Sequence, residues 1–268
     1  MIIVNCEQGT KEWLEARAGC ITASMFKDVR NTLKSGKNKG GYSKKADDYA
    51  FHLACERIAG ELLDDDQFVT WQMKRGNDLE PDARLAHETS MGILVEQCGF
   101  VMTDDGKFGA SLDGLIDKTG SSEYKCFTAP SSIKPILLDK DLSSITDQMQ
   151  GGMWITGKAY CDFVLYCPQL KKIGHELTII TVYRDNEYIE ELESDLLKFD
   201  KHVENYVKLL GEKCLRKHAG FARYQKSFLN SRLIKLASSE SKDDASSVLR
   251  ISEWADMFVR KSSARFKY

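Results

Sequence analysis

The chain has 268 residues, of which 42% are hydrophobic and 29% charged, and its formal net charge is −2. This balance is ordinary for one globular domain, or one domain with a small appendage, and it excludes intrinsic disorder and a strongly basic surface over the whole molecule. No stretch approaches the ~18 consecutive apolar residues of a membrane helix, and the first residues lack a signal-peptide pattern, so we expect a cytosolic or nuclear protein without a membrane partner.

The eight cysteines carry no signature of a metal site or a disulfide framework. They include no C-x-x-C pair and no histidine at the spacing of a zinc site. Only Cys214 lies beyond Cys167, whereas an iron–sulfur cluster needs a close set of cysteines. We therefore expect reduced, mostly buried thiols and no iron–sulfur cluster.

Charge is segregated along the chain. Residues 211–268 contain thirteen Lys and Arg against six Asp and Glu, whereas residues 1–210 carry a surplus of acidic residues. The C-terminal segment also contains an amphipathic stretch at 248–259. We therefore expect two parts, a domain over 1–210 and a basic helical extension over 211–268.

A second basic stretch covers residues 27–45, with seven Lys and Arg against Asp28 alone. Within it, residues 34–43 are rich in Gly and Lys, which predicts a flexible loop. Lys37 and Lys39 in this loop are candidates for contact with a nucleic-acid backbone, and solvated charge is the alternative.

The other elements follow from apolar periodicity, caps and turn residues. We predict helices at residues 8–17, 44–62 (capped by Ser43), 70–88, 143–156 and 186–210. We predict strands at residues 92–103, 108–117, 122–127, 160–167 and 176–183. This order indicates an α/β or α+β fold in which helices flank a mixed sheet.

Arg17, Thr22 and Ser24 lie just after the first predicted helix. Either hydroxyl can cap a second helix that would run to about Leu33. A cation and two hydroxyls beside a helix N-terminus also suit a phosphate group. A phosphate pocket therefore stands beside the simpler capping role.

Residues 111–125 predict two strands joined by a Gly-Ser turn. In the second strand Glu123 and Lys125 leave the same face, and Tyr124 leaves the other. The turn returns Asp113 to that end of the sheet. Two carboxylates and one ammonium then converge, which suits a hard cation and a phosphate, and the Tyr124 carbonyl is a natural extra ligand.

Glu80 is a further candidate ligand, because it lies where the helix at 70–88 contains Gly76 and Pro81. Both residues disfavour a helix interior, so we expect a kink or restart there. With Mg²⁺ or Mn²⁺, Glu80 and the hairpin could hydrolyse a phosphodiester. The alternative is that the D-x9-E-x-K spacing is fortuitous and the charges form a solvated face.

Four motifs in order resemble the lambda exonuclease and YqaJ-type viral recombinase family of the PD-(D/E)xK nuclease superfamily. They are W-x3-R-x-G-x-I-T-A-S at 13–24, G-x3-E-x2-A-R at 76–84, S-x-D-G with E-x-K-C at 111–126, and Q-x-Q-x2-M-W at 148–154. The match covers about residues 8–210. It implies a restriction-endonuclease-like fold, with a mixed central sheet flanked by helices.

The resemblance also implies roles for the candidate residues. It implies that Glu80, Asp113 and Glu123 bind two Mg²⁺ or Mn²⁺ ions. It makes Lys125 the catalytic lysine and Gln150 the glutamine that positions the nucleophile or the substrate.

A phosphate site and a wedge are implied as well. Arg17 and Ser24 resemble the pocket for the 5′-phosphate of the degraded strand. The family has an arginine shortly after E-x-K, where the nearest cation of this chain is Lys134. Met73 falls near the strand-separating region and is a candidate wedge, with ordinary core packing as the alternative.

The implied activity is digestion of double-stranded DNA from 5′-phosphorylated ends in the 5′→3′ direction during phage-type homologous recombination. The 3′ overhangs would pass to a single-strand annealing protein, a homotrimeric ring is implied, and the expected location is the host cytoplasm, or the nucleus for a eukaryotic virus. Two alternatives remain, namely a structure-selective or restriction-type endonuclease and a non-catalytic DNA-binding scaffold.

Overall fold

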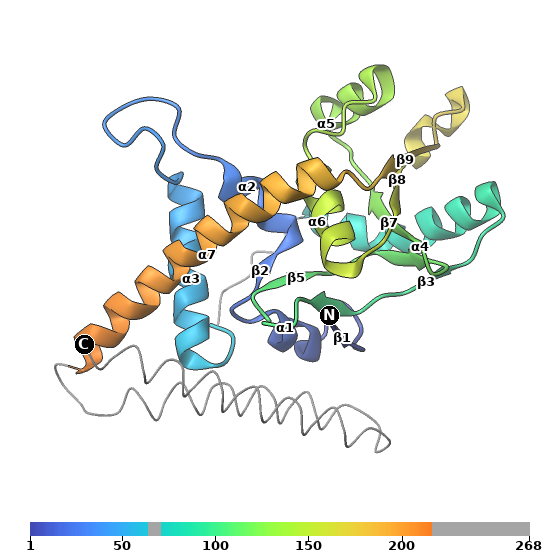
Figure 1. The fold of residues 1–268 in the computed structure, drawn as a ribbon. Helices are drawn as coiled ribbons and strands as arrows, with labels where there is room; N and C mark the ends of the chain where they lie inside the picture. Colours follow the sequence, from blue (N-terminus) through green and yellow to red (C-terminus); the bar gives the residue numbers. More distant parts are fainter. Residues whose placement is uncertain (64–70, 216–268) are drawn as a thin grey trace, which may run out of the picture.

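The protein is described from a computed structural model, which covers residues 1–63 and 71–215. Those residues form a mixed α/β fold in which helices flank two sheets (Figure 1). The segments 64–70 and 216–268 lie outside the described residues, and with them most of the predicted C-terminal extension. Within the described part, no helix is long and apolar enough to cross a membrane.

The strands of the described part fall into two sheets. The first has the order β1-β4-β5-β2, with β1 (Ile2–Val4), β2 (Ile21–Thr22), β4 (Phe100–Met102) and β5 (Phe108–Ala110). The second has the order β3-β6-β7-β8-β9, with β3 (Val95–Glu96), β6 (Gly114–Ile116), β7 (Gly120–Lys125), β8 (Tyr160–Tyr166) and β9 (Leu177–Tyr183). Strands β7 and β8 run parallel, whereas their outer neighbours β6 and β9 pair with them antiparallel. The predicted mixed sheet is therefore confirmed.

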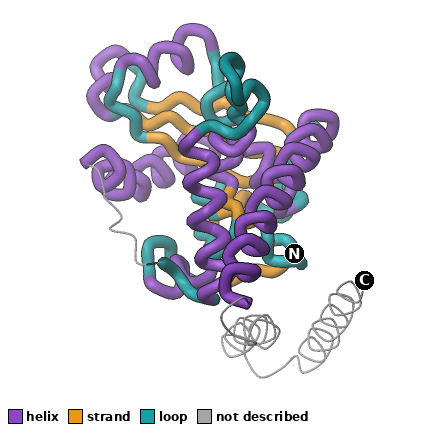
Figure 2. Tube along the Cα trace, turned by 90° about the vertical axis from the view of Figure 1, so that its left-hand side faces the viewer, coloured by secondary structure: helices purple, strands orange, loops and turns teal. Residues whose placement is uncertain are grey.

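Helices surround both sheets. They are α1 (Lys11–Arg17), α2 (Phe26–Arg30), α3 (Lys44–Ala59), α4 (Trp71–Met91), α5 (Pro130–Lys134), α6 (Thr146–Thr156) and α7 (Asn186–Leu215), with shorter turns η1 (Ala23–Met25), η2 (Pro135–Asp139) and η3 (Pro168–Ile173). The long helices α3 and α7 pack side by side, and α4 lies against β7, β8 and β9 (Figures 1 and 2).

The buried apolar side chains of the described part form four clusters, of which the two largest connect the helices with the sheets. The large cluster joins β2 and β5 to α2, α3 and α7, and it contains the fully buried side chains of Phe26 and Phe199. The smaller cluster packs α6 and η2 against β8 around Met153 and Phe163. The first sheet and α6 therefore hold the second sheet in place.

The longer predicted elements are present. Ser43 caps α3, since its Oγ accepts a hydrogen bond from the N–H of Ala46 at 3.2 Å. Helix α7 begins after Asp185 as predicted, but it runs unbroken to Leu215 and so enters the predicted extension. Helix α4 is also continuous across Pro81, so the predicted restart beside Glu80 is wrong.

Two of the predicted strands are each divided into two separate strands, so these two predictions are wrong. The stretch 92–103 divides into β3 and β4, which lie in different sheets, and 108–117 divides into β5 and β6. Gly99 explains the first division, because its backbone crosses very close to another segment. A Cβ there would lie 2.3 Å from the carbonyl oxygen of Val4. Close contacts of this kind leave no periodic signal in the sequence.

Candidate active site

The β6–β7 hairpin brings Asp113 level with Glu123. The two strands pair Gly114 with Ser122, so the next position along the hairpin places Asp113 opposite Glu123. The N–H of Tyr124 donates to Asp113 Oδ2 at 2.7 Å and fixes that carboxylate. The hairpin predicted for residues 111–125 is therefore present.

Gly114 allows the strands to approach at this point. A Cβ on Gly114 would lie 2.2 Å from Val95 Cγ1 and 2.5 Å from Ser122 Oγ. Any side chain would push β6 away from its neighbours. Because Asp113 directly precedes Gly114, its carboxylate would be displaced as well.

Glu123 and Lys125 leave the same face of β7 and form an ion pair, as their spacing predicts. The Glu123 side chain is 4% exposed and that of Lys125 is 24% exposed. Tyr124 leaves the other face, where its hydroxyl lies 3.2 Å from Nδ1 of the buried His87 on α4. The pair thus faces the site, and Tyr124 ties the strand to α4.

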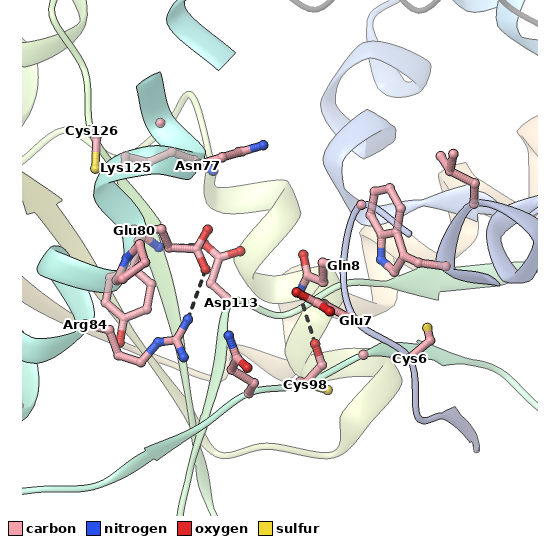
Figure 3. A pocket seen from close by; sticks show the side chains of 18 of the residues that line it. Cys6, Glu7, Gln8, Asn77, Glu80, Arg84, Cys98, Asp113, Lys125 and Cys126 are labelled. Carbon is pink, nitrogen blue, oxygen red and sulfur yellow. Dashed lines mark hydrogen bonds and ion pairs between the residues drawn. The ribbon is translucent and has the colours of Figure 1, made fainter. Parts of the chain in front are cut away.

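Helix α4 contributes Glu80, which pairs with Arg84 one turn later at 3.3 Å. Figure 3 shows the Glu80 and Asp113 carboxylates close together, with Lys125 reaching the same pocket from β7. The structure therefore brings together four of the predicted residues, namely Glu80, Asp113, Glu123 and Lys125.

Burial and mutual repulsion shift the pKa values of the carboxylates in this cluster. Burial raises the pKa of Asp113. Burial and the neighbouring Asp113 charge raise the pKa of Glu80, and they raise the pKa of Glu123 to about 7. Burial alone would lower the pKa of Lys125, but Glu123 and Asp113 outweigh it and raise that pKa. Lys125 stays protonated, and among the described residues Lys125 and Arg84 are the cations that lower the pKa values of these three carboxylates.

The donor set fits a hard divalent cation. Each carboxylate has one oxygen engaged, since Asp113 Oδ2 accepts from a backbone N–H, Glu80 Oε1 from Arg84, and Glu123 Oε1 from Lys125. Among the described residues, no hydrogen bond reaches the second oxygen of any of the three. Oxygen ligands and an excess of negative charge are what Mg²⁺ and Mn²⁺ prefer.

In this structure the three carboxylates do not form a three-ligand metal site. As the side chains stand, no group of three or more His, Cys, Asp or Glu residues in the described part could hold a metal ion. Mg²⁺ is usually bound through one or two protein carboxylates and keeps several of its waters. A magnesium site therefore does not need all three carboxylates as ligands.

Gln148, which the sequence did not single out as a site residue, reaches the cluster. Its Nε2 donates to Glu123 Oε1 at 2.5 Å. The predicted glutamine, Gln150, instead donates to the carbonyl of Tyr183 at 2.9 Å and accepts from the N–H of Asp185 at 3.0 Å. Residues two apart on a helix point in nearly opposite directions, so α6 can offer only one of them to β7. The structure does not bring Gln150 to the site.

A second group of polar side chains centres on Arg17. The Nη1 of Arg17 donates to Ser111 Oγ at 3.2 Å, and Trp13 Nε1 donates to the same oxygen at 2.8 Å. The guanidinium also lies 4.1 Å from the centre of the Trp13 ring. Ser111 precedes Asp113 by two residues, so Arg17 contacts the segment that leads to the carboxylate cluster. Sequence spacing could not reveal this contact.

The hydroxyls after α1 do not cap a helix, so the capping prediction for Thr22 and Ser24 is wrong. Neither the turn η1 nor α2 has a side-chain cap, and α2 ends at Arg30 instead of Leu33.

Ser24 is exposed, and its Oγ lies 3.3 Å from that of Thr22. Tyr49 donates to the backbone of Cys20 and lies within electrostatic range of Arg17. Within the described residues, Arg17 and Ser24 are linked only indirectly, through Thr22 and Tyr49.

No described contact joins the remaining predicted residues to the cluster. Lys134 is exposed at the end of α5. Lys37 and Lys39 lie on the exposed loop between α2 and α3, which Figure 1 shows on the opposite side of the molecule from β7. Met73 belongs to α4, but its side chain lies outside the described part.

A cleft of about 1980 Å³ opens over the cluster. Its wall includes Trp13, Glu80, Arg84, Asp113 and Lys125. Pockets for small ligands usually measure about 300–1,000 Å³. The cleft is therefore large enough for a polymer strand.

Comparison with known proteins identifies the family of the chain. Residues 12–159 match the model of the YqaJ-like viral recombinase domain. The chain belongs to this family. The family expected from the four sequence motifs is thereby confirmed. A search of the curated proteins finds no significant match.

Solved structures extend the likeness. The alkaline exonuclease LHK-Exo from Laribacter hongkongensis is 30% identical over 78% of this chain and 100% of its own, with a TM-score of 0.66. Its complex with dAMP gives the same values. A phage-related exonuclease from Haemophilus somnus 129PT is 18% identical over 72% of this chain and 96% of its own, with a TM-score of 0.51, which is a likeness of fold alone.

Proposed function

We propose that this chain is a divalent-metal-dependent exonuclease that degrades double-stranded DNA in the 5′→3′ direction. The observation that carries the proposal is the cluster of Glu80, Asp113 and Lys125 on the wall of a large cleft, with the buried Glu123 paired to Lys125. The likeness to LHK-Exo, an alkaline exonuclease, supports the same class of reaction.

The carboxylates would hold Mg²⁺ or Mn²⁺ through the oxygens that accept no hydrogen bond, with the Tyr124 carbonyl as a further ligand. Two ions are proposed, with Glu80 contributing to the second. When bound, such ions neutralise charge at the scissile phosphate and lower the pKa of a water molecule. Their absence would leave the excess negative charge of the cluster to repel the DNA backbone.

Lys125 would act directly on the substrate, whereas Gln148 would position Glu123. Lys125 is protonated, so it can donate to a phosphate oxygen and stabilise the charge that grows during cleavage. Gln148 holds Glu123 Oε1 in place, and we assign to it the positioning role that the family resemblance implies for Gln150. Gln150 would serve the fold at the junction of β9 and α7.

The direction of strand digestion would be set by the polar group around Arg17. A guanidinium and hydroxyls suit a terminal phosphate, and burial of the cation strengthens its attraction for an anion. A 5′-phosphate held by Arg17, Ser111 and Ser24 would place the first phosphodiester beside Asp113. Strand digestion would then proceed 5′→3′ and leave a 3′ overhang. The LHK-Exo complex with dAMP, a nucleoside monophosphate, supports a site for such a group.

Family membership supports a role in phage-type homologous recombination. The proposal includes a single-strand annealing protein as the recipient of the overhang, a homotrimeric ring around the DNA, and the host cytoplasm as the location. Lys134, Lys37 and Lys39 would contact DNA only outside the cutting centre. A wedge role for Met73 remains a proposal about a side chain outside the described residues.

Digestion of linear 5′-phosphorylated duplex beside closed circular DNA tests the function. With Mg²⁺ or Mn²⁺, the linear substrate should disappear and the circle should persist. Equal attack on the circle would show an endonuclease instead. Binding of both substrates without any cleavage would leave only a DNA-binding scaffold.

A further inference from the structure

Arg75 differs from the other cations that line the cleft. Each of the others is paired with a carboxylate, and the pairs are Lys11–Glu15, Arg84–Glu80 and Lys125–Glu123. Within the part of the chain that the structure describes, Arg75 has no carboxylate partner. Its Nη1 donates to the carbonyl oxygen of Cys126 at 2.9 Å.

The carbonyl of Cys126 fixes the position of the Arg75 guanidinium. Cys126 directly follows Lys125, so the anchored group lies at the end of the strand that carries the catalytic lysine. Arg75 also precedes Glu80 by five residues on α4, about 7.5 Å along the helix axis. Among the described residues, neither Nε nor Nη2 of Arg75 donates a hydrogen bond. Two donor nitrogens of Arg75 and its full positive charge are therefore available to a ligand at the cleft wall.

Such a group is suited to a phosphodiester. The planar guanidinium donates parallel hydrogen bonds to two phosphate oxygens, a geometry that a lysine cannot reproduce. The anchor at Cys126 has already restricted the side chain, so less rotamer entropy is lost when an anion binds. The neighbouring wall residues Thr128, Ala129 and Ser132 carry no charge that would compete.

We propose that Arg75 binds the non-bridging oxygens of a DNA phosphate next to Lys125 and so positions the strand for cleavage. This inference rests on the proposed function and adds a substrate-binding residue to it. It also gives the cutting centre a cation on α4 that can bind a phosphate, since the first cation after Cys126 in the chain is the exposed Lys134.

The proposal is tested by measuring DNA binding under conditions that prevent cleavage. Fluorescence anisotropy with a labelled 5′-phosphorylated duplex in EDTA, at several NaCl concentrations, gives the affinity and its salt dependence. The variants are Arg75→Gln, which removes the charge but keeps a polar side chain, and Arg75→Lys, which keeps the charge. Lys11→Gln is the matched control, because it removes a cation from the same cleft. Circular dichroism confirms that each variant is folded.

Arg75→Gln should weaken binding roughly tenfold or more and reduce the slope of log K against log salt by about 0.9. Arg75→Lys should retain the slope but bind less tightly than wild type, and Lys11→Gln should resemble wild type. Wild-type affinity and slope in Arg75→Gln, or an equal loss in Lys11→Gln, would overturn the inference. Failure of the wild type to degrade linear DNA with Mg²⁺ would instead refute the proposed function.

Discussion

Replacing Glu123 by glutamine should stabilise the fold while abolishing cleavage. The buried Glu123 side chain accepts hydrogen bonds from Lys125 and Gln148 through the same oxygen. Glutamine has nearly the same shape and can still accept these bonds, so the substitution removes a charge and little else. Since Asp113 and Glu80 lie beside that charge, it is unfavourable when no cation is bound.

The size of the effect follows from the pKa of Glu123. Burial and the charge of Asp113 raise this pKa from 4.5 to about 7, so the folded protein binds the proton more tightly than the unfolded chain does. Ionisation of Glu123 therefore destabilises the fold as pH rises from about 4.5 to about 7, and the full cost is present above that range. At about 1.36 kcal/mol per pH unit, the cost is about 3 kcal/mol at pH 8 and below about 1 kcal/mol at pH 5.

Thermal unfolding in EDTA measures this cost. The Tm of Glu123→Gln should exceed that of wild type by about 6 to 12 °C near pH 8 and by much less near pH 5. The exposed Glu96 of the same sheet supplies the control, because Glu96→Gln should change stability by less than about 0.5 kcal/mol. A lower Tm for Glu123→Gln near pH 8, or equal increases at both pH values, would refute the electrostatic argument.

Three further predictions concern separate parts of the site. Gln148→Ala should lower kcat with little loss of stability, whereas Gln150→Ala should cost about 1–3 kcal/mol of stability, because the buried Gln150 makes two hydrogen bonds to the backbone at the junction of β9 and α7; the reverse pattern in kinetics and thermal unfolding would return the positioning role to Gln150. Arg17→Ala should reduce the preference for 5′-phosphorylated over 5′-hydroxyl ends roughly tenfold or more, measured as a ratio of kcat/KM values, and an unchanged ratio would place the 5′-phosphate elsewhere. Because Glu123 must lose its proton to bind a cation, the affinity for Mg²⁺ measured by calorimetry should rise between about pH 6 and pH 8, and an affinity that is constant over this range would contradict the assigned ligand.

The sequence predicts the hairpin at the centre of the site, because local geometry determines it. Alternation along a strand puts Glu123 and Lys125 on one face, and a short turn fixes the position of Asp113 opposite. Both features require only neighbouring residues. Accordingly, the ion pair and the hydrogen bond from Tyr124 to Asp113 match what spacing alone indicates.

Features that depend on distant segments were not predictable in this way. Arg17 meets Ser111 because β2 pairs with β5, and nothing local to either residue indicates that pairing. Gln148 and Gln150 belong to one motif, yet only the packing of α6 decides which of them faces β7. The anchor of Arg75 on Cys126 likewise depends on how α4 lies against the sheet.

The most direct test of the central claim is a digestion time course on linear duplex labelled separately at its 5′ and 3′ ends. With 5′-phosphorylated DNA and Mg²⁺, the 5′ label should be released first as a mononucleotide, while the 3′ label should persist on a shortening duplex with a growing 3′ overhang. Earlier release of the 3′ label, or internal fragments that carry either label, would contradict the account.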